Sequence, residues 1–282
     1  MSSDLKRIMT FLIGILALSI ALPAQDNTEI IEKSFRTEGG RPAVLEFHDV
    51  DGLLILSSST EEAISVRIRK EVKIRDAKRA QRLLDDTKVE IEQRDNTVTI
   101  RIRYPRFRGL FFWLRDLARV KVVSEIKVPA GIQIKADLVD GSIRGENIQG
   151  DIVVDVVDGD VLLDGLNGTV RVDSVDGDTQ VSGEIKGLDL KSVDGDIRVD
   201  LFPGSAIGDN WRIRTADGDM DIVLPEDFAA DLEVRKGDGR LQTDWPLTEK
   251  GLARRTLSGK IGPGGPLFSI RTVDGRVTLR RR

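Results

Sequence analysis

The chain has 282 residues, with 47 acidic and 43 basic side chains and a formal net charge of −4 at pH 7. Such mild acidity excludes general nucleic-acid binding, which needs a basic surface. The chain contains no Cys, so disulfide bonds, thiolate zinc sites and a thiol nucleophile are also excluded.

The first 24 residues have the pattern of a secretory signal peptide. Lys6 and Arg7 precede the apolar run FLIGILALSIAL at 11–22, and Pro23-Ala24 comes before polar residues. The run is shorter than the roughly 20 residues that a membrane span requires. We expect cleavage after Ala24 and export to the periplasm or surface of a bacterium, with an uncleaved anchor as the alternative. Residues 25–41 are interpreted as a linker.

Residues 42–125 are interpreted as an N-terminal β part. HDVDGLLIL at 48–56 and ISVRIRKEVKI at 64–74 alternate between apolar and polar residues, which is typical of strands. A helix is predicted over 76–86, because Asp76 can cap it and Ala80, Leu83 and Leu84 share one face. A hairpin is expected around Asp95-Asn96, followed by an aromatic loop at 104–120.

Residues 126–282 are interpreted as a regular repeat. Asp-Gly recurs every eighteen residues at 140, 158, 176 and 194, and further Gly corners lie halfway between, at 149–150, 167–168 and 186–187. Apolar residues repeat with the same period of nine. A fixed period of this kind predicts a stack of short strands joined at glycine corners.

Two all-β architectures fit this period. One is a single β-solenoid built of 9-residue half-coils, 18 residues per coil, with the short helix inserted. The other is an antiparallel β-meander with Asp-Gly and Asn-Gly hairpin turns. The solenoid is favoured because it lets the apolar corner residues face the core. These corner residues are Val139, Ile148, Val157, Leu166, Val175, Val193 and Phe202.

The period loosens after Leu201, and the Gly-rich tail from Thr256 onward ends in one more repeat. We expect this tail to form the closing rung of the stack. A closing rung would cover strand edges that otherwise expose unpaired backbone groups.

The stacked Asp-Gly corners suggest two readings. Rows of Asp158, Asp176 and Asp194, and of Asp160, Asp178 and Asp196, would lie about 4.8 Å apart, and Ca²⁺ could relieve their repulsion. The alternative is structural, because Asp can accept hydrogen bonds from the amides of its own turn. The structural reading is favoured, and no metal site is predicted.

Catalysis has little support in the residues. His48 is the only His, so a Ser-His-Asp arrangement could be built only around it. A polysaccharide-active enzyme that uses paired carboxylates on a β-solenoid scaffold remains the alternative function.

The segment RFRGLFFWLRDLARV, 106–120, is the candidate contact surface. Phe107, Phe111, Phe112 and Trp113 lie among four Arg residues, at 106, 108, 115 and 119. Such a cluster suits an anionic membrane surface or a protein groove. The alternative is that the loop covers one end or flank of the solenoid.

The rungs of the form V-D-G-D, the lead-in KVPAG at 127–131 and the terminal GKIGPGGPLFSIRTVDGRVTL resemble the bacterial putative-adhesin, or toast-rack, family of unknown function. The resemblance covers about residues 40–282 and implies an exported, solenoid-like protein of the cell envelope. The family supplies no catalytic residues. We therefore expect a noncatalytic, adhesin-like binding or scaffold protein without a cofactor, whose partner is a protein, glycan or membrane surface of the envelope.

Overall fold

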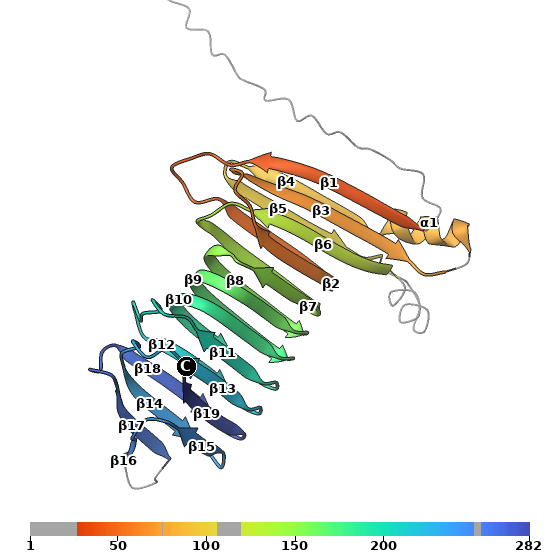
Figure 1. Ribbon diagram of the computed structural model, residues 1–282. Helices are drawn as coiled ribbons and strands as arrows, with labels where there is room; N and C mark the ends of the chain where they lie inside the picture. Colours follow the sequence, from red (N-terminus) through yellow and green to blue (C-terminus); the bar gives the residue numbers. More distant parts are fainter. Residues whose placement is uncertain (1–26, 75, 106–119, 251–254) are drawn as a thin grey trace, which may run out of the picture.

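The computed structural model describes residues 27–74, 76–105, 120–250 and 255–282 (Figure 1). The predicted signal peptide, residues 1–24, lies outside the described residues. In chain order the elements are β1 (Thr28–Arg36), β2 (Val44–Ser58), β3 (Ala63–Val72), α1 (Ala77–Asp86), β4 (Lys88–Arg94), β5 (Thr97–Arg103), β6 (Val120–Val128), β7 (Ile132–Glu146), β8 (Gln149–Asp158), β9 (Val161–Asp176), β10 (Thr179–Lys191), β11 (Ile197–Leu201), β12 (Trp211–Thr215), β13 (Met220–Leu224), β14 (Ala230–Lys236), β15 (Arg240–Thr243), β16 (Thr248–Lys250), β17 (Thr256–Ile261), β18 (Leu267–Thr272) and β19 (Arg276–Arg281).

The repeat forms a stack of parallel coils. Residues eighteen positions apart lie side by side, as Val154 does with Val172 and Asp158 with Asp176. Val154 and Val172 are both buried. The parallel pairing confirms the β-solenoid and shows that the antiparallel meander is wrong, because a meander reverses its direction at every turn.

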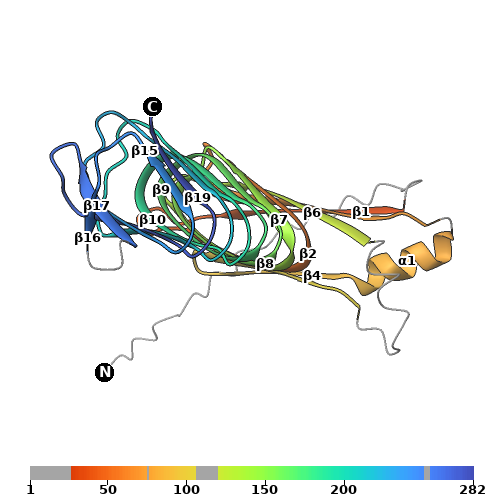
Figure 2. The same ribbon diagram turned by 90° about the horizontal axis from the view of Figure 1, so that it is seen from below.

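Each coil has two faces, and the core fills the space between them. Face 1 consists of the first halves of β2 and β7, then β8, the second halves of β9 and β10, and β12, β18 and β14. Face 2 consists of the second halves of β2 and β7, the first halves of β9 and β10, and β11, β13, β19 and β15. Figure 2 looks along the stack and shows the coils superposed.

The two corners of a coil differ, which the period of nine does not predict. Ile148 and Leu166 lie at one corner and are buried, as expected. Val139, Val157, Val175 and Val193 lie at the Asp-Gly corner and are 44–50% exposed, so the expectation that they face the core is wrong. Strand alternation continues up to this corner: Val156 and Ser174 point inward, and the next residue therefore points outward. Phe202 is only half-buried.

The N-terminal end of the stack carries additional strands. β5 pairs parallel with β2 on face 1, and β4 pairs antiparallel with the other edge of β5. On face 2, β6 pairs with β2, and β3 and β1 follow in antiparallel order. Residues 25–41 are thus not simply a linker, because Thr28–Arg36 form β1. The sequence gives little sign of this strand, since only Phe35 of β1 is buried.

The predicted helix is confirmed as α1, Ala77–Asp86. The carboxylate of Asp76 accepts hydrogen bonds from the amides of Lys78 and Arg79, at 3.0 and 3.1 Å. At the other end, the buried ammonium group of Lys70 donates to the carbonyl groups of Leu84 and Thr87. Both ends of the helix therefore have partners for their free backbone groups.

The C-terminal tail is inserted into the stack and does not close it. β18 lies between β12 and β14 on face 1, and β19 lies between β13 and β15 on face 2 (Figure 1). The terminal coil is instead formed by β14 and β15, and β17 and β16 pair antiparallel beyond β14. The prediction of a closing rung is therefore wrong in its position, because pairing of edges and not chain order decides where a coil is placed.

Candidate binding groove

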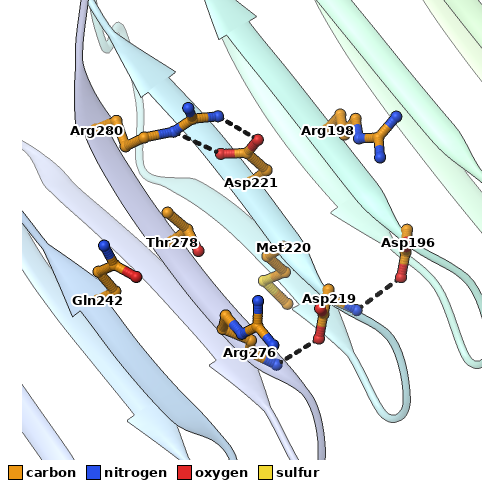
Figure 3. A pocket seen from close by; sticks show the side chains of 9 residues that line it. All are labelled: Asp196, Arg198, Asp219, Met220, Asp221, Gln242, Arg276, Thr278 and Arg280. Atoms are coloured by element: carbon orange, nitrogen blue, oxygen red, sulfur yellow. Dashed lines mark hydrogen bonds and ion pairs between the residues drawn. The ribbon is translucent and has the colours of Figure 1, made fainter.

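A groove of about 380 Å³ lies on the outer surface of face 2, where β11, β13, β19 and β15 are neighbours (Figure 3). All of its lining residues except Met220 are polar or charged. They are Asp196, Arg198, Asp219, Met220, Asp221, Gln242, Arg276, Thr278 and Arg280.

Strand register sets the floor of the groove. Arg198 lies opposite Asp221, and Asp221 lies opposite Thr278. Gln242 lies opposite Thr278 on the other side. Their strand neighbours Val199, Ile222 and Leu279 point into the core. Alternation along each strand thus presents a row of polar side chains at one-strand intervals of about 4.8 Å.

The three carboxylates of the groove already have partners. Asp196 accepts a hydrogen bond from the amide of Asp219 at 2.8 Å, and Asp219 accepts one from the amide of Arg276 at 2.7 Å. Asp221 forms an ion pair with Arg280, in which the Nε–Oδ1 distance is 3.1 Å. These acids therefore hold the coils together and position Arg280.

The guanidinium groups of Arg198 and Arg276 are exposed. Within the part of the chain that the structure describes, neither group has a hydrogen-bond or ion-pair partner; the contact of Arg276 with Asp219 uses its main-chain amide. A guanidinium group is a planar donor suited to carboxylate, sulfate and phosphate. These two groups, the amide of Gln242 and the hydroxyl of Thr278 are donors suited to an anionic, hydroxyl-bearing ligand.

The sequence did not predict this groove. Asp221 and Arg280 are 59 positions apart, and they meet because β19 is inserted beside β13. The alternating tail from Arg276 to Arg282 signals a strand but does not identify its neighbours.

A second hollow, of about 310 Å³, lies between β2, β5 and β7 and contains His48. The Nδ1 atom of His48 is 2.8 Å from Oδ2 of Asp137. Beside it, Asp49 is only 4% exposed, and burial raises its pKa to about 6. Its Oδ1 atom accepts from the amides of Val50 and Asp51, so Asp49 stabilises the corner of the first coil.

One of the two acidic rows considered for Ca²⁺, that of Asp160, Asp178 and Asp196, has a structural use. Asp160 accepts from the amide of Asp178, and Asp178 accepts from the amide of Asp196, at 3.0 and 2.9 Å. Each carboxylate in this row thus joins one coil to the next. Among the described residues, no group of three or more His, Cys, Asp or Glu side chains has an arrangement that could hold a metal ion.

The predicted contact residues Phe107, Phe111, Phe112 and Trp113 lie outside the described residues. The chain enters this segment after Tyr104, whose hydroxyl donates to the carbonyl group of Asp51. The structure therefore leaves their proposed role as a prediction. In the described ranges, no helix has the length and apolarity needed to cross a membrane.

The stack of parallel coils defines an all-β, solenoid-like protein. The family described as Toastrack DUF4097 matches residues 124–280, which is more than half of the chain, and the chain belongs to this family. Comparison with curated proteins finds no match.

Several solved structures are distantly similar. A putative cell adhesion protein from Clostridium sporogenes has a TM-score of 0.44 and 13% identity, with 90% of this chain and 100% of that chain covered. Putative adhesins from Bacteroides fragilis and Parabacteroides distasonis have TM-scores of 0.30 and 0.35, identities of 11% and 12%, and coverage of 90% of this chain and 97% of each of theirs. These TM-scores are too low for the similarities to support a conclusion about function.

Proposed function

We propose that the protein is a noncatalytic, exported binding module of the bacterial cell envelope, adhesin-like, that takes acidic glycans in the groove on face 2. The observation that carries the proposal is the pair of exposed guanidinium groups, those of Arg198 and Arg276, set in a rigid sheet surface. Membership of the Toastrack family and the signal-peptide pattern at residues 1–24 support the envelope location.

Recognition follows from the geometry of the stack. Strands about 4.8 Å apart fix the positions of the Arg, Thr and Gln side chains before a ligand arrives. A preorganised surface loses less side-chain freedom on binding than a flexible one. Arg198 and Arg276 are proposed to bind acidic groups of the glycan, while Gln242 and Thr278 bind its hydroxyls.

The test uses a double variant, Arg198→Gln with Arg276→Gln, and polygalacturonate as the acidic probe. Each lost charge-assisted hydrogen bond costs about 1.5–3 kcal/mol, so affinity should fall at least about tenfold. Arg144→Gln is the matched control, since Arg144 is exposed on face 2 but outside the groove. Uncharged dextran should bind neither form.

Equal affinity of the wild type and the double variant would contradict the proposal. An equal loss in Arg144→Gln would show that only the general charge matters. Shortening of the polysaccharide during incubation would instead identify the alternative, a polysaccharide-active enzyme. Fractionation of cells that express the full chain tests export, with the protein expected in the periplasm or at the surface.

A further inference from the structure

The most exposed apolar side chains of the described structure gather in one column. Eight large apolar residues stand out as exposed in the described ranges, and six of them occupy the same place at the Asp-Gly corners. The six are Val50, Val139, Val157, Val175, Val193 and Val273, and they are 44–61% exposed.

The column is continuous from Val50 to Val193, and Ala216 lies between Val193 and Val273. The carbonyl group of Val175 accepts from the amide of Asp194 at 2.8 Å, and that of Val193 accepts from the amide of Asp217 at 2.9 Å. We call Val139, Val157, Val175 and Val193 the valine ridge. With about 4.8 Å between coils, its three steps span about 14 Å. Exposed apolar side chains in a contiguous patch mark contact surfaces more often than scattered ones do.

Unpaired carboxylates run along one side of the valine ridge. Asp140, Asp158, Asp176 and Asp194 directly follow the four valines and are exposed. In the described part of the chain, none of these side chains has an ion-pair or hydrogen-bond partner. Their repulsion at one-strand spacing would be relieved by a row of cations.

The other side of the ridge carries both acids and cations along its first three valines. Asp155 lies on face 1 between Asp137 and Asp173, which are its partners in the neighbouring coils. His48 pairs with Asp137, and both Arg171 and Lys191 pair with Asp173. Among the described residues Asp155 has no ion pair, so it carries the unpaired negative charge on this side, and the Asp row carries that on the other.

We propose that the valine ridge is a docking surface for a segment of a partner protein that carries an apolar stripe bordered by Lys and Arg. The stripe covers the valines, and its cations neutralise the Asp row. At a rise of 1.5 Å per residue, a helix of about ten residues spans the ridge. Anionic lipid headgroups would meet like charge, and so would the ridge of a second copy. This surface lies at the Asp-Gly corner, next to the end of the groove that Asp196 lines, but the two proposals rest on different side chains and stand or fall separately.

The probe is a synthetic amphipathic helix of about ten to fourteen residues, with Leu on one face and Lys beside it. Its counterpart replaces every Lys with Glu. Fluorescence anisotropy with the full chain should show binding of the Lys peptide that weakens with salt, and at least about tenfold weaker binding of the Glu peptide.

Variants of the ridge keep the fold while changing its chemistry. Val157→Thr with Val175→Thr conserves shape and strand preference, and should weaken binding of the Lys peptide at least about fivefold. Val153→Thr is the matched control, because Val153 lies on the outer surface of face 1 away from the ridge, and it should bind as the wild type does. Asp158→Asn with Asp176→Asn should weaken binding and reduce its salt dependence.

Several outcomes would overturn the proposal. Equal binding of both peptides would remove the charge argument, and unchanged binding by the folded Thr variant would remove the ridge. Binding of anionic vesicles, or self-association in sedimentation that the Thr variant abolishes, would assign the ridge to a membrane or to a second copy. If the peptide binds only after residues 106–119 are replaced with a Gly-Ser linker, the occupant of the ridge is that segment of the chain and not a partner protein.

Discussion

Gly177 allows a test of how closely the coils must approach at the Asp-Gly corner. Its φ is +117°, and a Cβ atom at this position would lie 2.4 Å from the carbonyl oxygen of Gly159 in the preceding coil. Gly177→Ala therefore adds two costs. Backbone strain costs about 1–3 kcal/mol, and overpacking costs a further 1–3 kcal/mol. Ala also reduces the conformational freedom of the unfolded chain, which offsets about 0.4–1 kcal/mol of this cost. The net loss in the free energy of unfolding is about 3 kcal/mol.

Gly131→Ala is the matched control. Gly131 also has a positive φ, +74°, but no atom lies within 4 Å of its added Cβ. Only the backbone cost of about 1–2 kcal/mol applies, and it is partly offset in the unfolded chain. Urea unfolding followed by circular dichroism measures both variants. Equal losses of stability would refute the reasoning, because they would mean that close approach between the coils contributes nothing.

Three further predictions use the same unfolding assay. Asp178→Ala should lower the free energy of unfolding by about 1 kcal/mol, and Asp178→Asn by much less, since the side-chain amide oxygen of Asn can still accept from the main-chain amide of Asp196. A rise in melting temperature with Ca²⁺ that Asp178→Asn abolishes would instead support the metal site. Burial raises the pKa of Asp49 from 3.8 to about 6, so the unfolded chain loses this proton first. Stability should therefore fall by about 3 kcal/mol as pH rises from about 4 to 6, and Asp49→Asn should abolish that part of the slope; an unchanged slope would show that Asp49 is not its source. Leu163→Ala should cost about 2–5 kcal/mol, whereas Leu162→Ala, on the outer surface, should cost less than about 1 kcal/mol; similar costs would contradict the assignment of inward and outward positions.

The sequence predicted the helix, but of the seven corner residues expected in the core only Ile148 and Leu166 are buried. α1 was predictable because its signals are local: Asp76 caps the first turn, and Ala80, Leu83 and Leu84 share a face. Inward positions such as Val161 and Leu163 were predictable because strand alternation has a period of two. The groove was not predictable, because Arg198, Asp221 and Arg280 come from three strands whose order depends on long-range pairing.

By itself, the sequence determined that this chain forms stacked β coils with glycine corners, because an eighteen-residue spacing of Asp-Gly imposes the same local turn on every coil. It did not distinguish the two corners, since a period of nine treats Leu166 and Val175 as equivalent. Only the tertiary structure decided that Leu166 is buried and Val175 exposed, and that β18 and β19 lie inside the stack. The physical reason is that local patterns fix the conformation of a coil, whereas backbone hydrogen bonds between strand edges, which any sequence can form, fix which coils are neighbours.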